Sequence, residues 1–261
     1  MKLPLYQIDA FTSRMFGGNP AAVVLLDSWL PDRALQAIAA ENNLAETAFV
    51  VPRGEIMPLR WFTPTVEVDL CGHATLAAAD VLFRHTFPSV KRLTFGTRSG
   101  DLTVTRDGDW LAMDFPSRPA EPVDIEDVAV SALGIRPKEL HRARDLLAIF
   151  ESESQIRDFR PDFGRMASID AFGITISAPG ESVDYVYRFF APRQGIPEDP
   201  VTGSANCTLV PYWAARLGKT DLVAKQLSAR GGDLRCALRG DRVLIAGRAV
   251  EYLRGEIAVE V

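Results

Sequence analysis

The feature of this sequence that most constrains its fold is an internal repeat, in which similar short segments recur in the same order about half a chain apart. Gly100-Asp101-Leu102 is matched by Gly232-Asp233-Leu234, 132 residues further along. Other matches, at offsets of 128 to 132 residues, pair Arg60–Pro64 with Arg188–Pro192, Gly72–Ala74 with Gly203–Ala205, and Gly108-Asp109 with Gly240-Asp241. Gly-Asp turns are common, so a single match would mean little. Ordered matches at nearly constant offset instead indicate a duplicated lobe.

Each half of the chain shows the same predicted order of elements, namely strands, a glycine-containing turn that opens a helix, and a closing hairpin. In the first half the pattern predicts strands over 3–11, 21–27, 47–51 and 59–63, helices over 31–42 and 74–83, and a hairpin within 93–115. Residues 116–130 are rich in Pro, Glu and Asp and are interpreted as a connection. We therefore expect an N-terminal lobe over 1–116 and a C-terminal lobe over 117–261, with the last strand free to pack back on the N-terminal lobe.

Composition excludes several classes of function. The 261 residues are 47% hydrophobic, enough for a sizeable core, and the net charge of -5 gives no electrostatic support for binding nucleic acid. Three scattered cysteines and three histidines form neither a disulfide framework nor a zinc motif, so no metal is expected. No signal peptide or membrane-spanning apolar run is found, which predicts a cytoplasmic protein without a membrane partner.

The two glycine turns, Gly72-His73-Ala74 and Gly203-Ser204-Ala205, are each expected to open a helix. The free N–H groups and the positive dipole end of a helix N-terminus favour negatively charged ligands. If the lobes face one another, we expect both turns to meet at a central cleft that binds a small anionic metabolite.

The two copies differ at positions that carry chemistry. His73 corresponds to Ser204, and Glu46 precedes a strand whose counterpart is preceded by Phe172-Gly173. Glu198-Asp199-Pro200 lies before the second turn. The corresponding stretch of the first copy contains Glu67 and Asp69, and the sequence alone does not fix which residue aligns with which. A duplicated scaffold with unlike polar positions favours a directional reaction with distinct acid and base roles.

The motifs along the chain resemble those of the phenazine-biosynthesis isomerase (PhzF) family, a branch of the diaminopimelate-epimerase-like fold. The segments that carry the resemblance are Asp9–Phe11, Phe16–Pro20 (FGGNP), Ala45–Phe49 (AETAF), Arg60–Pro64 (RWFTP), Glu67–Thr75 (EVDLCGHAT), Arg188–Pro192 and Gly195–Ala205 (GIPEDPVTGSA). They follow one another in order and cover nearly the whole chain. The resemblance implies an α+β fold of two pseudo-symmetric lobes, each a curved mixed or antiparallel sheet wrapped around a central helix.

The resemblance also implies an activity and a set of site residues. It implies a cofactor-independent isomerase and a homodimer. In the family's characterised chemistry, a proton is moved between two carbons of a dihydro-hydroxyanthranilate; for this chain the resemblance implies a proton shift on a small carboxylate-bearing metabolite. The residues that match the family's site are Glu46 as the catalytic acid and base, His73 and Asp199 as further catalytic residues, and Asn19, Gly72, Gly203 and Ser204 as substrate-binding residues. For a base of this kind, partial burial of the Glu46 carboxylate is expected to raise its pKa.

Two alternatives remain open. An amino-acid racemase or epimerase would rely on Cys71, which could instead be a small buried residue at the cleft edge. The second turn, Val201-Thr202-Gly203-Ser204, offers no matching thiol, and Cys207 is expected to point into the helix body. A non-catalytic metabolite-binding protein of the same fold is the other alternative.

Overall fold

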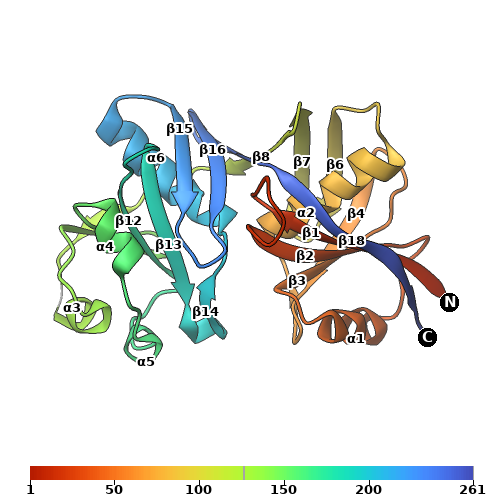
Figure 1. Cartoon of the computed structure of the whole chain (residues 1–261), viewed down its shortest axis with the longest axis horizontal. Coiled ribbons are helices and arrows are strands. Elements are labelled where there is room, and N and C mark those ends of the chain that lie inside the picture. The colour runs from red at the N-terminus through yellow and green to blue at the C-terminus, as the bar shows by residue number, and fades with distance from the viewer. Residues whose placement is uncertain (126, 261) are drawn as a thin grey trace. The chain divides into compact units, whose positions relative to one another are not determined.

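The computed structural model describes residues 1–125 and 127–260, and the chain divides into two compact units (Figure 1). Unit 1 comprises Met1–Asp114 and Ala246–Val261, and unit 2 comprises Phe115–Ile245. Chain segments from both ends of the sequence thus belong to unit 1.

The described residues of unit 1 form a mixed sheet with two helices and a π-helical turn. Its elements are β1 (Lys2–Ala10), β2 (Asn19–Leu25), α1 (Asp32–Asn42), β3 (Glu46–Val50), β4 (Ile56–Phe62), β5 (Glu67–Val68), α2 (Gly72–Val81), η1 (Leu82–Thr86), β6 (Arg92–Thr97), β7 (Gly100–Asp107), β8 (Trp110–Pro116) and β18 (Ala249–Ala258). The strand order is β18-β1-β2-β3-β4-β6-β7-β8, with β5 also on β4; the β2–β3 and β4–β6 pairs are parallel. The last strand, β18, pairs with β1 over its whole length.

Local sequence explains the two helices of unit 1. In α1 the residues Leu35, Ile38 and Ala39 recur at helical spacing and are buried, and Asn43 ends the helix in the left-handed conformation. Every residue of α2 after Gly72 is buried, and its alanines let the sheet approach closely. The helix α2 contacts β1, β2 and β3 and is the central helix of this unit.

Unit 2 repeats this arrangement with extra short helices. Its elements are β9 (Glu121–Val123), α3 (Asp127–Leu133), β10 (Glu139–Arg142), β11 (Leu146–Ile149), α4 (Glu153–Asp158), α5 (Phe163–Met166), β12 (Ile174–Pro179), β13 (Tyr185–Ala191), η2 (Pro192–Gln194), β14 (Ile196–Asp199), η3 (Gly203–Ala205), α6 (Asn206–Leu217), β15 (Asp221–Gln226), β16 (Gly232–Arg239) and β17 (Arg242–Gly247). The strands β9 to β13 follow one another in space, β15 and β16 continue the sheet, and β14 lies on β13.

Strand register confirms the repeat residue by residue. Thr47 pairs with Phe62 across β3 and β4, as Ile174 pairs with Phe190 across β12 and β13. The parallel pairs β2–β3 and β4–β6 recur as β11–β12 and β13–β15.

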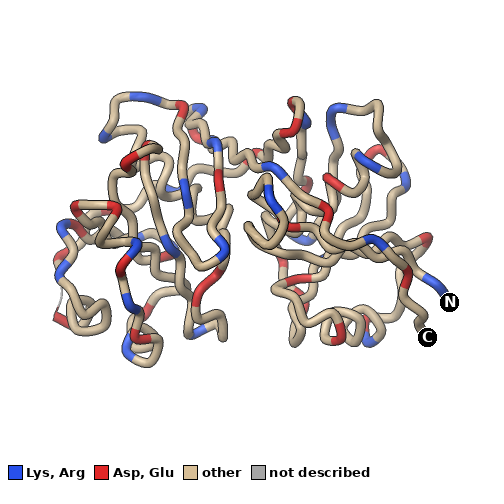
Figure 2. Tube along the Cα trace, in the orientation of Figure 1, with Lys and Arg blue, Asp and Glu red and all other residues tan. Residues whose placement is uncertain are grey.

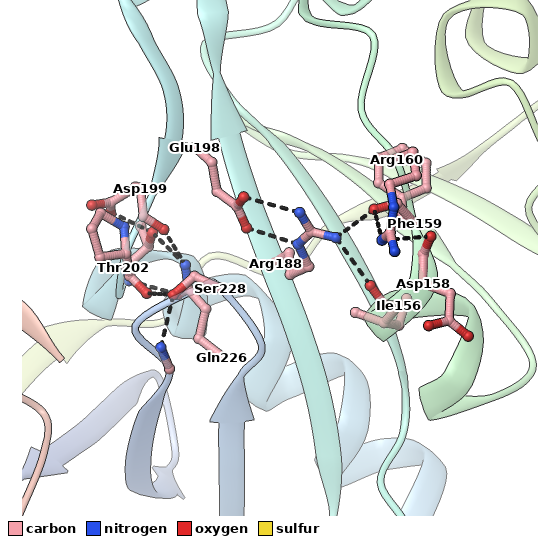
Figure 3. A network of polar contacts seen from close by, with 12 residues as sticks. Ile156, Asp158, Phe159, Arg160, Arg188, Glu198, Asp199, Thr202, Gln226 and Ser228 are labelled. Atoms are coloured by element: carbon pink, nitrogen blue, oxygen red, sulfur yellow. Dashed lines mark hydrogen bonds and ion pairs between the residues drawn. The ribbon is translucent and has the colours of Figure 1, made fainter. Parts of the chain in front are cut away.

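A pair of equivalent ion pairs supports this register. The Arg60 guanidinium binds both oxygens of Glu67 at 2.7 and 2.8 Å, and Arg188 binds both oxygens of Glu198 at 2.7 and 2.9 Å (Figure 3). Glu67 is therefore the counterpart of Glu198, which settles the register that the sequence left uncertain.

The prediction that residues 116–130 form only a connection is wrong in part. Glu121–Val123 form β9, which pairs with β10, and α3 begins at Asp127. The prolines of this stretch argued against a strand, but an edge strand can contain proline, because its outer side needs no hydrogen-bond donor. The predicted hairpin turn is confirmed: β7 ends at Asp107, β8 begins at Trp110, and Gly108 has a φ of 57°.

Charged residues of both signs are interspersed along each unit (Figure 2), in keeping with the small net charge of -5. Within residues 1–125 and 127–260, no helix has the length and apolarity needed to cross a membrane.

Candidate active site

Glu46, the residue with the strongest prediction of a catalytic role, is the first residue of β3. It lies opposite Ala21 in the parallel β2–β3 pair, and only 14% of its side chain is exposed. Side chains alternate across a strand, so Glu46 shares a sheet face with Ala48, whereas Phe49 packs in the core on the α1 side. The carboxylate is therefore on the face that α2 covers.

His73 and Cys71 bring two further polar groups to this carboxylate from the start of α2. The His73 Nε2 lies 3.0 Å from the Glu46 Oε2, and the Cys71 Sγ lies 3.5 Å from the His73 Nδ1. Cys71 is the N-cap residue of α2 and holds an extended conformation; its carbonyl accepts a hydrogen bond of 2.6 Å from the Thr75 hydroxyl. The imidazole thus lies between a carboxylate and a thiol.

The charges of this cluster depend on one another. Burial raises the pKa of Glu46, but the positive charge of His73, its close contact with the carboxylate and a contact from Cys71 together outweigh burial, so the pKa of Glu46 lies below its ordinary value. Burial lowers the pKa of His73, yet Cys71 and Glu46 together raise it well above 6.5. Burial also raises the pKa of the Cys71 thiol to about 11. Because that thiol is uncharged near neutral pH, the Glu46 carboxylate is the group that retains the proton on His73.

The expectation that burial would raise the pKa of Glu46 is therefore wrong in direction. Burial acts as expected, but a buried cation 3.0 Å away reverses its effect. Near neutral pH the cluster is an ion pair of carboxylate and imidazolium, with a neutral thiol beside it.

Neither of the facing atoms is satisfied by hydrogen bonding. The Glu46 Oε2 and the His73 Nε2 are buried and have no hydrogen-bond partner of acceptable geometry among the described residues, although their separation of 3.0 Å is that of an ion pair. A buried polar atom left in this state is costly unless a ligand or water completes it. The two groups are thus held together by their opposite charges, without an aligned hydrogen bond between them.

The other predicted site residues of unit 1 lie on neighbouring elements. Asn19 is the first residue of β2 and is fully buried, and Gly72 is the first residue of α2, directly between Cys71 and His73.

Glu46, Cys71 and His73 also form the one set of ligand-type side chains close enough to share a metal ion within the described residues, since their ligand atoms lie within 4.8 Å of one another. A metal ion bound by all three groups would hold Cys71 as a thiolate and His73 as a neutral imidazole, because the metal displaces their protons.

Unit 2 places Asp199, Gly203 and Ser204 in one short segment. Asp199 is the last residue of β14. The chain then forms η3, which is one turn of 3₁₀ helix, and continues into the central helix α6. The Asp199 Oδ2 accepts a hydrogen bond from the Thr202 hydroxyl (Figure 3). Ser204 is half-buried in that turn. The predicted site residues thus fall into two groups, one in each unit.

The repeat shows which groups are specific to one unit. By strand register Gly173 is the counterpart of Glu46. A Cβ at Gly173 would lie 2.2 Å from the Phe189 Cζ, so the phenyl ring fills the space in which a second carboxylate would stand. Unit 2 has no acid at this position.

Gln226 was missed by the sequence analysis. Its Nε2 donates to the Asp199 carbonyl at 2.6 Å, and its Oε1 accepts from the Thr202 N–H at 2.7 Å. No motif marks this residue; only the parallel pairing of β15 with β13 brings it to the segment.

Comparison with known proteins gives a consistent family assignment. The family model described as phenazine biosynthesis-like protein (PhzC-PhzF) matches residues 8–255. A protein of Pseudomonas aeruginosa named as an uncharacterised isomerase is 51% identical over 257 residues, covering 98% of this chain and 99% of its own length.

Solved structures agree. The crystal structure of a PhzF-family phenazine biosynthesis protein from Enterococcus faecalis has a TM-score of 0.98 at 44% identity, covering 99% of this chain and all of that one. A hydroxyproline epimerase from Agrobacterium vitis matches with a TM-score of 0.64 at 10% identity, over 99% of this chain and 93% of its own, which shows a common fold. The architecture is thus α+β and of the diaminopimelate-epimerase-like type, as expected from the sequence.

Proposed function

The chain belongs to the phenazine biosynthesis-like (PhzC-PhzF) family and is an isomerase, and we propose that it moves a proton between two carbons of a small carboxylate-bearing metabolite, with Glu46 as acid and base. No cofactor takes part in the proposed reaction. The observation that carries the proposal is the buried Glu46–His73 ion pair, whose facing atoms lack hydrogen-bond partners within residues 1–125 and 127–260.

In the proposed reaction the Glu46 carboxylate removes a proton from one carbon of the substrate and returns it to another carbon. The C–H bonding electrons stay in the substrate as a delocalised anion, and the carboxyl proton goes back when the second C–H bond forms. Because His73 holds the pKa of Glu46 low, the base is ionised before substrate arrives. A bound carboxylate then adds negative charge nearby, which raises the proton affinity of Glu46 when it is needed.

The comparison of the two units supports the proposal of a single base. In unit 2 the position that corresponds to Glu46 is Gly173, and the Phe189 ring occupies the adjoining space. One carboxylate that both accepts and returns the proton suits transfer on one face of a ring, whereas inversion at one carbon needs bases on two faces.

The remaining site residues are proposed to bind the substrate. Protonated His73 supplies positive charge to an anionic ligand. The starts of α2 at Gly72 and of η3 at Gly203 offer backbone N–H groups, and the Ser204 hydroxyl and the Asn19 amide offer further hydrogen bonds. Asp199 is proposed to act as a further catalytic residue, with its carboxylate in contact with a polar group of the same substrate during the reaction. A homodimer is proposed by analogy with the family.

The proposal is tested by incubating the protein with cyclic amino and hydroxy acids that carry a carboxylate and a ring double bond, and following isomerisation by proton NMR. Glu46→Gln should lower the turnover of any substrate found by about 100- to 10,000-fold. The matched control is Glu41→Gln, an exposed glutamate on α1, which should behave as wild type. Full turnover by Glu46→Gln would refute the acid/base role and leave the non-catalytic alternative standing.

A further inference from the structure

The segment that carries Asp199 is bound by Thr202 and Gln226, whose counterparts among the described residues of unit 1 make different contacts. We propose that Thr202 and Gln226 are positioning residues, which hold the Asp199 carboxylate in one orientation for the reaction. This inference rests on the proposed role of Asp199 in that reaction.

The contacts around Asp199 leave its segment little freedom (Figure 3). The Thr202 hydroxyl donates to one oxygen of the Asp199 carboxylate. Gln226, which is fully buried, bridges the two residues through their backbones, since its amide donates to the Asp199 carbonyl and accepts from the Thr202 N–H. The carboxylate, the turn and β15 are therefore joined in one network.

Further hydrogen bonds fix backbone groups of the same segment. The Ser228 hydroxyl donates to the Pro200 carbonyl at 2.6 Å. The buried Asn206 amide donates to the carbonyls of Thr202 and Gly203 at 3.3 and 3.2 Å. With so many backbone groups fixed, the hydroxyl of Thr202 has a defined place from which to orient the carboxylate.

The repeat separates contacts that serve the fold from contacts found in one unit. The pair Arg60–Glu67 recurs as Arg188–Glu198, and the bond from Ser99 to the Asp69 carbonyl resembles that from Ser228 to the Pro200 carbonyl. Contacts present in both copies are explained by the common scaffold alone.

Asp199, Thr202 and Gln226, in contrast, correspond to residues of a different type in unit 1. Register pairs Trp61 with Val68 and Phe189 with Asp199, so Val68 is the counterpart of Asp199. By the offset of the turns, Cys71 is the counterpart of Thr202, and its thiol contacts His73 instead.

The counterpart of Gln226 is identified in the same way. The parallel pairs Met57 with Phe95 and Tyr185 with Ala224 place Thr97 at the position of Gln226. The Thr97 hydroxyl bonds within its own hairpin, to Gly100 and Ser99. All three residues of the network thus differ in type from their counterparts in unit 1. This joint difference supports their action as one group.

The inference is tested with Thr202→Val, which removes the hydroxyl at nearly constant volume, and Thr202→Ser, which keeps it. With a substrate that shows Glu46-dependent turnover, Thr202→Val should lower kcat on the order of 10- to 100-fold with KM changed less than about threefold, because the aspartate is still present but misaligned. Thr202→Ser should restore most of the activity. Thr208→Val, at the same 7% exposure in α6, is the matched control and should be active.

Coupling to Asp199 supplies the decisive comparison. In an Asp199→Asn background, Thr202→Val should cause no further loss, because two residues that act through one group are not additive. Wild-type activity of Thr202→Val, equal loss in Thr202→Ser, or additive losses would each overturn the inference. If Thr202→Val does not fold, Thr202→Ala against Thr202→Ser gives the same comparison.

The inference and the proposed function fail in different ways. An active Asp199→Asn variant beside an inactive Glu46→Gln variant would overturn the role of Asp199, and with it this inference, while the proposed base stands. An active Glu46→Gln variant would refute the proposed function itself.

Discussion

The charge state of His73 gives a prediction that needs no substrate. Replacing Glu46 by Gln keeps the shape of the side chain but removes the negative charge 3.0 Å from the His73 Nε2. At that distance, with an effective dielectric constant of about 20, the attraction is about 5.5 kcal/mol. Burial of His73 opposes its protonation, and in the variant only the contact with Cys71, a neutral thiol near neutral pH, still opposes the effect of burial. The pKa of His73 should therefore move from above 6.5 to below it.

The assay is a proton–carbon NMR titration of the imidazole signals. The chain has three histidines, and His73→Asn assigns the signal of interest. His85 and His141 serve as internal references, because each faces a different carboxylate, Glu251 and Glu139. The expected result is a large acid shift of the His73 midpoint in Glu46→Gln with the other two unchanged. An unchanged His73 midpoint would refute the ion pair and the pKa argument built on it.

Three further predictions concern stability and the thiol. The difference in melting temperature between wild type and Glu46→Gln should be largest between pH 4.5 and 6.5, where the ion pair contributes fully to stability. This difference should become smaller as the pH falls through the lowered pKa of Glu46 or rises through the raised pKa of His73. A difference that does not depend on pH would contradict this prediction. Cys71→Ala should lower activity by less than about tenfold, because a neutral hydrogen bond is worth about 1 kcal/mol; complete loss would support the racemase alternative. Gly173→Ala should lower the free energy of unfolding by about 1–3 kcal/mol, as measured by urea unfolding, because the new methyl group overpacks against the Phe189 ring. The control Gly255→Ala, which has open space around it, should not be destabilised. Equal stability of the two variants would show that the Phe189 ring moves aside at little cost.

Much of the fold could be predicted from the sequence because its signals are local. The spacing of Leu35, Ile38 and Ala39 is enough to predict α1, and Asp107 to Trp110 is a recognisable hairpin turn. The repeat added long-range information, since matching segments imply matching strand pairs. The repeat also predicted that Gly173 occupies the position in the second copy that corresponds to Glu46 in the first, and the strand register confirms this.

The electrostatics of the site could not be predicted in this way. Glu46 and His73 are 27 positions apart, and their 3.0 Å contact arises only when α2 packs on β3. Burial alone predicted a raised pKa for Glu46, and the sign changed once the partner was known. Gln226 had no signal at all, because a buried glutamine in a strand belongs to no motif and its role comes from parallel pairing with β13.

The most direct test of the account is the rate at which a substrate carbon exchanges its proton with solvent D2O. This rate isolates removal of the proton from later steps. We expect rapid exchange with wild type and with Glu41→Gln, and exchange slower by about 100-fold or more with Glu46→Gln. Exchange at the wild-type rate in Glu46→Gln would show that another group removes the proton, and would contradict the central claim.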